Sequence, residues 1–130
     1  MEGHRAYRLG IIAMAVPLAA CSAAKATEAP TSKATSAVTI KTFAFGPKEL
    51  RVPVGTTVTW TNQDDILHTV TSGTRETDAQ GQPTNVQKDG TFDAQLDGVG
   101  ATTTYKFSKA GTVTYFCDRH PGMDAKVIVG

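Results

Sequence analysis

The chain has 130 residues, of which 40% are hydrophobic and 19% charged, and its formal net charge is +1. These values are typical of one soluble globular domain and exclude two large domains. The balanced charge and the few aromatic residues argue against nucleic-acid binding, which needs a basic surface and side chains that stack on bases. The rare side chains are more informative, because the chain has only three His, two Cys and three Met.

The first 20 residues are predicted to be a signal peptide. Arg5 and Arg8 provide a short basic start. The apolar run that follows, residues 9–18, is too short to span a bilayer comfortably as a permanent helix. We therefore expect the chain to be exported.

The apolar run ends in Leu-Ala-Ala-Cys at residues 18–21, which resembles the lipobox of bacterial lipoproteins. The resemblance implies cleavage before Cys21 and lipidation of Cys21, so a lipid anchor alone would hold the protein on the periplasmic or cell-surface side of a bacterial membrane. Two alternatives stay open at this point: a soluble secreted protein, and a disulfide between Cys21 and Cys117. Residues 21–36 contain no large apolar side chain, and we interpret them as the lipidated cysteine followed by a flexible tether.

Residues 37–130 are the predicted folded domain, and their pattern is typical of an all-β protein. Short runs rich in β-branched residues alternate with turn residues at intervals of roughly 8 to 15 residues, which is the spacing of a β-sandwich or barrel. No convincing helical period appears. We predict about eight strands, within residues 38–43, 49–52, 57–61, 68–71, 91–96, 102–107, 112–117 and 125–129.

Alternation within these runs predicts which side chains face the core. Val58 and Trp60 share one face of their strand, and Tyr115 and Cys117 share one face of another. Cys117 is therefore predicted to point inward. Residues 72–89 are polar and long for a hairpin, so we expect a surface excursion with room for a fragment of helix.

The rare residues of the predicted domain gather in sequence around Cys117. His120 and Met123 follow Cys117 at three-residue intervals, residues 121–122 are Pro-Gly and favour a tight turn, and His68 opens another predicted strand. Taken singly, each is more simply a core cysteine, a satisfied histidine or a gap-filling methionine. Together, two imidazoles, a thiolate and a thioether are the blue-copper ligand set, and a thioether is a poor ligand for zinc, the rival metal.

Residues 38–130 resemble the cupredoxins, the small blue copper proteins of the plastocyanin and amicyanin group. The landmarks are Phe43-Ala-Phe45 with Pro47, the stretch from Val54 to Asn62, Asp65 ahead of His68, the stretch from Gly111 to Cys117, His120-Pro-Gly-Met123 and the closing residues 126–129. The short spacing from Cys117 to Met123 is that of amicyanin.

This resemblance implies a Greek-key β-sandwich with one type 1 copper near one end. It implies that the copper ligands are His68, Cys117, His120 and Met123. It further implies that electrons pass through the exposed edge of His120, so a redox partner would dock there.

Two departures from the family pattern matter. Many members have Asn directly after the first His ligand, where it ties the ligand strands together, but this chain has Thr69. Plastocyanins have Tyr before the Cys ligand, on a second electron route with an acidic docking patch, whereas this chain has Phe116. We therefore expect no second, acidic docking site, and we interpret the acidic residues Asp64, Asp65, Glu76 and Asp78 as solvated surface.

The function predicted from the sequence is that of a membrane-tethered, extracytoplasmic one-electron carrier between a redox donor and a redox acceptor. We expect a monomer that binds no nucleic acid and is not an enzyme, since copper enzymes need further His-rich sites and both mature histidines are already used. The alternative is copper binding for homeostasis or delivery. A single Met and an inward-facing Cys favour a retained metal over an exchangeable one.

Overall fold

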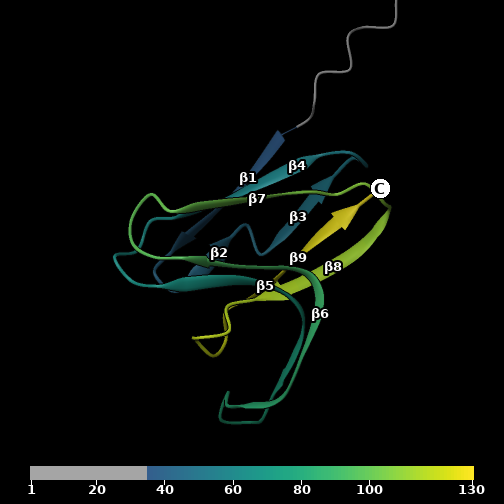
Figure 1. The fold of residues 1–130 in the computed structure, drawn as a ribbon. Coiled ribbons are helices and arrows are strands. Elements are labelled where there is room, and N and C mark those ends of the chain that lie inside the picture. Colours follow the sequence, from purple (N-terminus) through teal and green to yellow (C-terminus); the bar gives the residue numbers. More distant parts are fainter. Residues whose placement is uncertain (1–34) are drawn as a thin grey trace, which may run out of the picture.

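The computed structural model of the chain describes residues 35–130, which form two packed β-sheets (Figure 1). The predicted signal peptide, Cys21 with its lipid or disulfide, and the tether up to residue 34 lie outside the described residues. In the segment that is described, no helix is long and apolar enough to cross a membrane.

The two sheets are built from strands that are distant in the sequence. The first has the order β2-β1-β4-β7 and the second the order β3-β9-β8-β5-β6. The pairs β1–β4 and β3–β9 are parallel, and the other pairs are antiparallel. This arrangement confirms the predicted all-β, Greek-key sandwich. The strands are β1 (Thr35–Lys41), β2 (Ala44–Gly46), β3 (Glu49–Val52), β4 (Thr57–Asn62), β5 (His68–Thr77), β6 (Pro83–Leu96), β7 (Thr102–Lys106), β8 (Gly111–Phe116) and β9 (Asp124–Val129).

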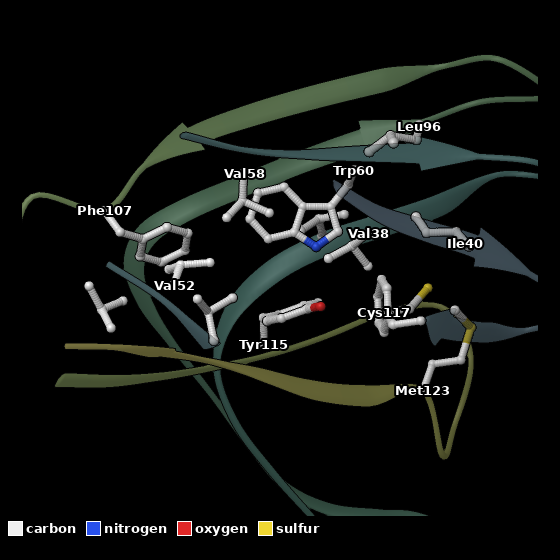
Figure 2. Packing of buried hydrophobic residues seen from close by; sticks show 14 residues of the cluster. Val38, Ile40, Val52, Val58, Trp60, Leu96, Phe107, Tyr115, Cys117 and Met123 are labelled. Atoms are coloured by element: carbon white, nitrogen blue, oxygen red, sulfur yellow. The ribbon is translucent and has the colours of Figure 1, made fainter. Parts of the chain in front are cut away.

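The core fills the space between the sheets. Along β4 the buried positions alternate with half-buried threonines, which is the pattern of a strand with one face on the core. Val58 and Trp60 of β4 are 0% exposed, and the Trp60 ring stands edge-on to Tyr115 of β8 at 5.5 Å between centroids (Figure 2). Cys117 is also 0% exposed, so the predicted inward direction of its side chain is confirmed.

Residues 35–130 form nine strands, one more than the eight predicted runs. The first run, expected to continue through Phe43, ends at Lys41 because Thr42 and Phe43 adopt φ angles of 52° and 57°. These left-handed residues reverse the chain, and Ala44–Gly46 then pairs back onto β1 as β2.

The expectation of a helix fragment within residues 72–89 is wrong. These residues continue β5 and β6 into an antiparallel arm, residues 73–90, which projects beyond the sandwich (Figure 1). Pairing between the two strands satisfies those backbone groups of this polar segment that face the partner strand. At its tip the Asp78 carboxylate accepts hydrogen bonds from the backbone N–H groups of Gln80 and Gln82, both at 2.9 Å.

Candidate metal centre

Three of the predicted ligands converge at one end of the sandwich. His68 is the first residue of β5, Cys117 follows the last residue of β8, and His120 lies in the loop from β8 to β9. One ligand atom from each lies within 4.8 Å of the others. The Cys117 Sγ is 3.7 Å from Nδ1 of His68 and 3.3 Å from Nδ1 of His120.

Met123, the fourth predicted ligand, lies at the same end. Its side chain is 2% exposed, and Figure 2 shows its sulfur and that of Cys117 at the same end of the core. The Cys117 N–H donates to the Met123 carbonyl at 2.9 Å, which closes residues 117–123 into a compact loop. We call these residues the ligand loop.

Asp64 orients the ring of His68. Its Oδ2 lies 2.9 Å from Nε2 of His68, so the imidazole can donate from Nε2 and present Nδ1 to Cys117. The same carboxylate accepts the backbone N–H groups of Thr42 at 2.8 Å and Phe43 at 3.1 Å. Burial alone would raise the pKa of Asp64, but the two amides and the His68 ring hold this pKa below its ordinary value.

Treating Asp64 as solvated surface is therefore wrong, because its side chain is 17% exposed and its carboxylate has three partners. The residues grouped with it, Asp65, Glu76 and Asp78, are exposed as expected. The one sequence feature that points to this contact is the spacing, since Asp64 lies four residues before His68.

Asn62 shapes the turn that leads into His68. This side chain at the end of β4 is fully buried, and its Nδ2 donates to the carbonyls of Ile66 at 2.8 Å and Leu96 at 3.0 Å. Its Oδ1 accepts the backbone N–H of Asp64 at 2.9 Å. The amide group thus holds Asp64 and the start of β5 in a fixed relation.

Thr69 takes over the role expected of the usual Asn. Its backbone N–H donates to the Cys117 Sγ at 3.3 Å, and its hydroxyl accepts the Asp118 N–H at 2.7 Å. The hydroxyl also contacts Thr71 Oγ1 at 3.0 Å. A hydroxyl can accept as an amide oxygen does, so β5 remains tied to the ligand loop in spite of the departure.

Phe43 covers the two imidazoles from the solvent side. Its ring is edge-on to His120 at 5.0 Å and to His68 at 5.7 Å between centroids, while 54% of the residue remains exposed. His120 is half-buried beneath it. Burial lowers the pKa of His120, with the charges of His68 and Arg119 acting in the same direction, and this favours the neutral imidazole that binds metals.

Arg75 is a second residue at this site, after Asp64, whose role was not predicted from the sequence. It lies in the arm, yet its guanidinium donates to the carbonyls of Cys117 at 2.6 Å, His120 at 3.0 Å and Met123 at 3.1 Å. A single arginine within the polar segment of residues 72–89 gives no indication in the sequence that it contacts the ligand loop.

These donors fit copper. Thiolate and thioether sulfur suit Cu(I), imidazole nitrogen accommodates Cu(II), and a trigonal His-Cys-His set with a weak Met ligand is the blue-copper arrangement. A two-sheet β-sandwich with this donor set at one end defines a mononuclear copper protein.

Comparisons with known proteins agree with this class. Residues 32–130 match the copper binding proteins of the plastocyanin/azurin family. Amicyanin-alpha of Methylorubrum extorquens is 32% identical over 127 residues, which cover 91% of this chain and 97% of that protein. Chloroplastic plastocyanin of Tetradesmus obliquus is 34% identical over 90 residues, which cover 67% of this chain but only 59% of that protein.

A solved structure extends the agreement to three dimensions. The purple cupredoxin of Nitrosopumilus maritimus matches with a TM-score of 0.55 at 27% identity, over 73% of this chain and 99% of that chain. The chain belongs to the plastocyanin/azurin family of copper-binding proteins, and its cofactor is copper.

Proposed function

We propose that this protein is an extracytoplasmic one-electron carrier whose single type 1 copper is held by His68, Cys117, His120 and Met123. The observation that carries the proposal is the convergence of the His68, Cys117 and His120 donor atoms within 4.8 Å, at a fully buried thiol. When bound, copper supplies a one-electron couple between Cu(I) and Cu(II).

The protein's own residues prepare the site for that couple. Asp64 orients His68, and the Thr69 N–H donates to the Cys117 sulfur. Core packing excludes water, since His68 and Cys117 are 0% exposed and Met123 is 2% exposed. Ligands held in this way need little rearrangement when an electron enters or leaves, which favours fast transfer.

The redox partners are proposed to dock around His120. Of the three clustered donors it is the one that is not fully buried, and Phe43 beside it exposes an apolar ring. Such a surface fits the small, weak interfaces of electron-transfer complexes. We propose that the protein acts as a monomer. We also propose that it is not an enzyme, because both histidines of residues 35–130 belong to this one cluster and none is left for a further copper site.

Burial of the ligands supports electron transfer over copper delivery. A delivery site must exchange its metal with a partner, which favours exposed ligands. Here the thiol and one imidazole are inaccessible, so exchange would require the ligand loop to open.

The protein is further proposed to be a lipoprotein. Cleavage before Cys21 and lipidation of its sulfur and amino group would leave the residues before β1 as a tether between membrane and domain. Mass spectrometry of the membrane fraction tests this: a lipidated N-terminal Cys21 is expected, and an intact N-terminus or a Cys21 to Cys117 disulfide would contradict it.

Voltammetry and copper competition together test the carrier function. We expect a reversible one-electron wave, fast electron self-exchange, and slow transfer of Cu(I) to a chelating competitor. Phe43→Ala should slow self-exchange through the docking surface, whereas Val54→Ala, a matched change at an exposed apolar residue, should not. Rapid release of Cu(I), with slow or irreversible electron transfer, would favour delivery instead.

A further inference from the structure

Arg75 occupies an unusual position for a residue of a largely exposed arm. Its neighbours Thr74 and Glu76 are exposed, whereas the Arg75 side chain is 2% exposed. The pairing of β5 with β6 shifts register between Thr71 and Gly73, just before it. Gly73 has φ +137°, and a Cβ there would lie 2.0 Å from the Gln87 carbonyl oxygen, so this irregularity requires glycine.

Three of the guanidinium's hydrogen bonds reach carbonyls of the ligand loop, and its other contacts reach Asp124 of β9 and the Phe116 ring. Arginine has five N–H donors in a planar fork. Nη1 donates to the carbonyls of Cys117 and His120, and Nη2 donates to that of Met123. Nε donates to the Asp124 carboxylate at 3.1 Å, which Nη2 also approaches at 3.0 Å. The guanidinium carbon lies 5.1 Å from the centre of the Phe116 ring, which adds a cation–π contact.

This set of contacts joins the backbone of three clustered residues to one rigid group. Because Cys117, His120 and Met123 each contribute a carbonyl to it, their relative positions are constrained through the backbone. The loop backbone has two other described ties, because the Cys117 N–H donates to the Met123 carbonyl and the Asp118 N–H donates to the Thr69 hydroxyl. Two side chains of the loop are also held, since the Cys117 sulfur accepts the Thr69 N–H and the Asp118 carboxylate pairs with Lys88.

We propose that Arg75 is a positioning residue of the copper site, which organises the ligand loop before copper binds and slows the loss of bound copper. This inference rests on the ligand set proposed above. The fork is essential to it, because lysine would keep the positive charge but offer one point of donation in place of a planar group. The buried Arg75 cation repels a site that holds Cu(II) more strongly than one that holds Cu(I), so it stabilises Cu(I) relative to Cu(II).

The experiment compares Arg75→Lys and Arg75→Gln with Arg51→Gln in the copper-loaded chain. Arg51 is a matched control, because it is an arginine paired with a carboxylate but its side chain is 72% exposed and lies on β3. The rate of Cu(II) transfer to excess EDTA is measured for each. We expect both Arg75 variants to release copper about 10–100-fold faster and Arg51→Gln to match the parent.

The reduction potential separates charge from positioning. Arg75→Gln removes the cation, so its potential should fall, and a tenfold change in the relative stabilisation of Cu(I) corresponds to about 59 mV. Arg75→Lys should retain more of the parent potential while still releasing copper quickly. If Arg75→Lys releases copper at the parent rate, or if neither variant changes it, the positioning role is refuted.

Hydrogen exchange on metal-free protein tests the loop independently of copper. In Arg75→Lys the amides of Cys117 and Asp118 should exchange at least tenfold faster, while those of β4 keep their parent rates. A uniform acceleration would show a merely structural role and overturn the proposal. Arg75→Lys also decides the matter if Arg75→Gln does not fold. If the parent chain binds no copper, the proposed ligand set is refuted. The exchange measurement uses metal-free protein, so it tests the effect of Arg75 on the loop separately from the ligand set.

Discussion

Replacing Asp64 by alanine should destabilise the protein even without copper. The substitution removes the acceptor of a His68 ring that is 0% exposed, and an unpaired buried donor costs about 1–3 kcal/mol. It also releases the N–H groups of Thr42 and Phe43, two consecutive residues with positive φ, in a turn where water can replace the carboxylate. These two bonds add about 0.5–1 kcal/mol in total, so the loss is about 1.5–4 kcal/mol.

Urea unfolding of the metal-free protein measures this loss directly. For a domain of this size it corresponds to a fall in Tm of roughly 6–32 °C. Copper affinity should also fall, by about 10–100-fold, because His68 loses the group that orients its ring. Asp65→Ala is the control, since this neighbouring carboxylate is exposed and should change stability by less than about 0.5 kcal/mol. A loss below about 1 kcal/mol for Asp64→Ala, or equal effects of the two substitutions, would refute the reasoning.

Three further predictions concern the arm and the core. Gly73→Ala should lower the free energy of unfolding in urea by more than about 3 kcal/mol, because the new Cβ would clash with the backbone of β6. Gly90→Ala has open space around its Cβ and should cost about 1 kcal/mol. Equal losses for the two variants would contradict the close approach at Gly73. The Ser72 hydroxyl donates to Asp89 and lowers the pKa of that carboxyl below its ordinary value. The carboxylate therefore stabilises the protein above the pKa of the unfolded chain, and this stabilisation is lost as the pH falls through the folded pKa. Asp89→Asn should therefore lower stability near neutral pH and flatten its decline in acid, as followed by unfolding at a series of pH values; a parallel decline would argue against the linkage. Tyr115→Phe should change the free energy of unfolding by less than about 1 kcal/mol, because this buried hydroxyl has no hydrogen-bond partner among the described residues. A much larger loss in urea unfolding would contradict this prediction.

The strands and the clustered donors could be predicted from sequence because their signals are local. Alternation places Trp60 and Cys117 inward, and His120 and Met123 follow Cys117 within a single turn. His68 is distant in sequence, but it could be chosen because the predicted domain has so few histidines.

The residues that orient these donors could not be found in the same way. Asp64 is one of several carboxylates in a polar loop, and its role depends on where Thr42 and Phe43 bring their amides. Arg75 contacts the ligand loop from a strand whose pairing shifts register just before it, at Gly73, and a polar run has no hydrophobic period from which such contacts could be predicted. Tertiary contacts decide both cases.

The most direct test of the account is a Cu(II) titration of the protein followed by visible absorption and EPR, with Cys117→Ser as a matched variant that replaces one buried sulfur by oxygen. We predict binding of one copper per chain, an intense thiolate-to-copper band and a narrow copper hyperfine splitting, with the band and the narrow splitting lost in the variant. Copper binding without that band, or a band that survives in Cys117→Ser, would contradict a type 1 site built on this thiol.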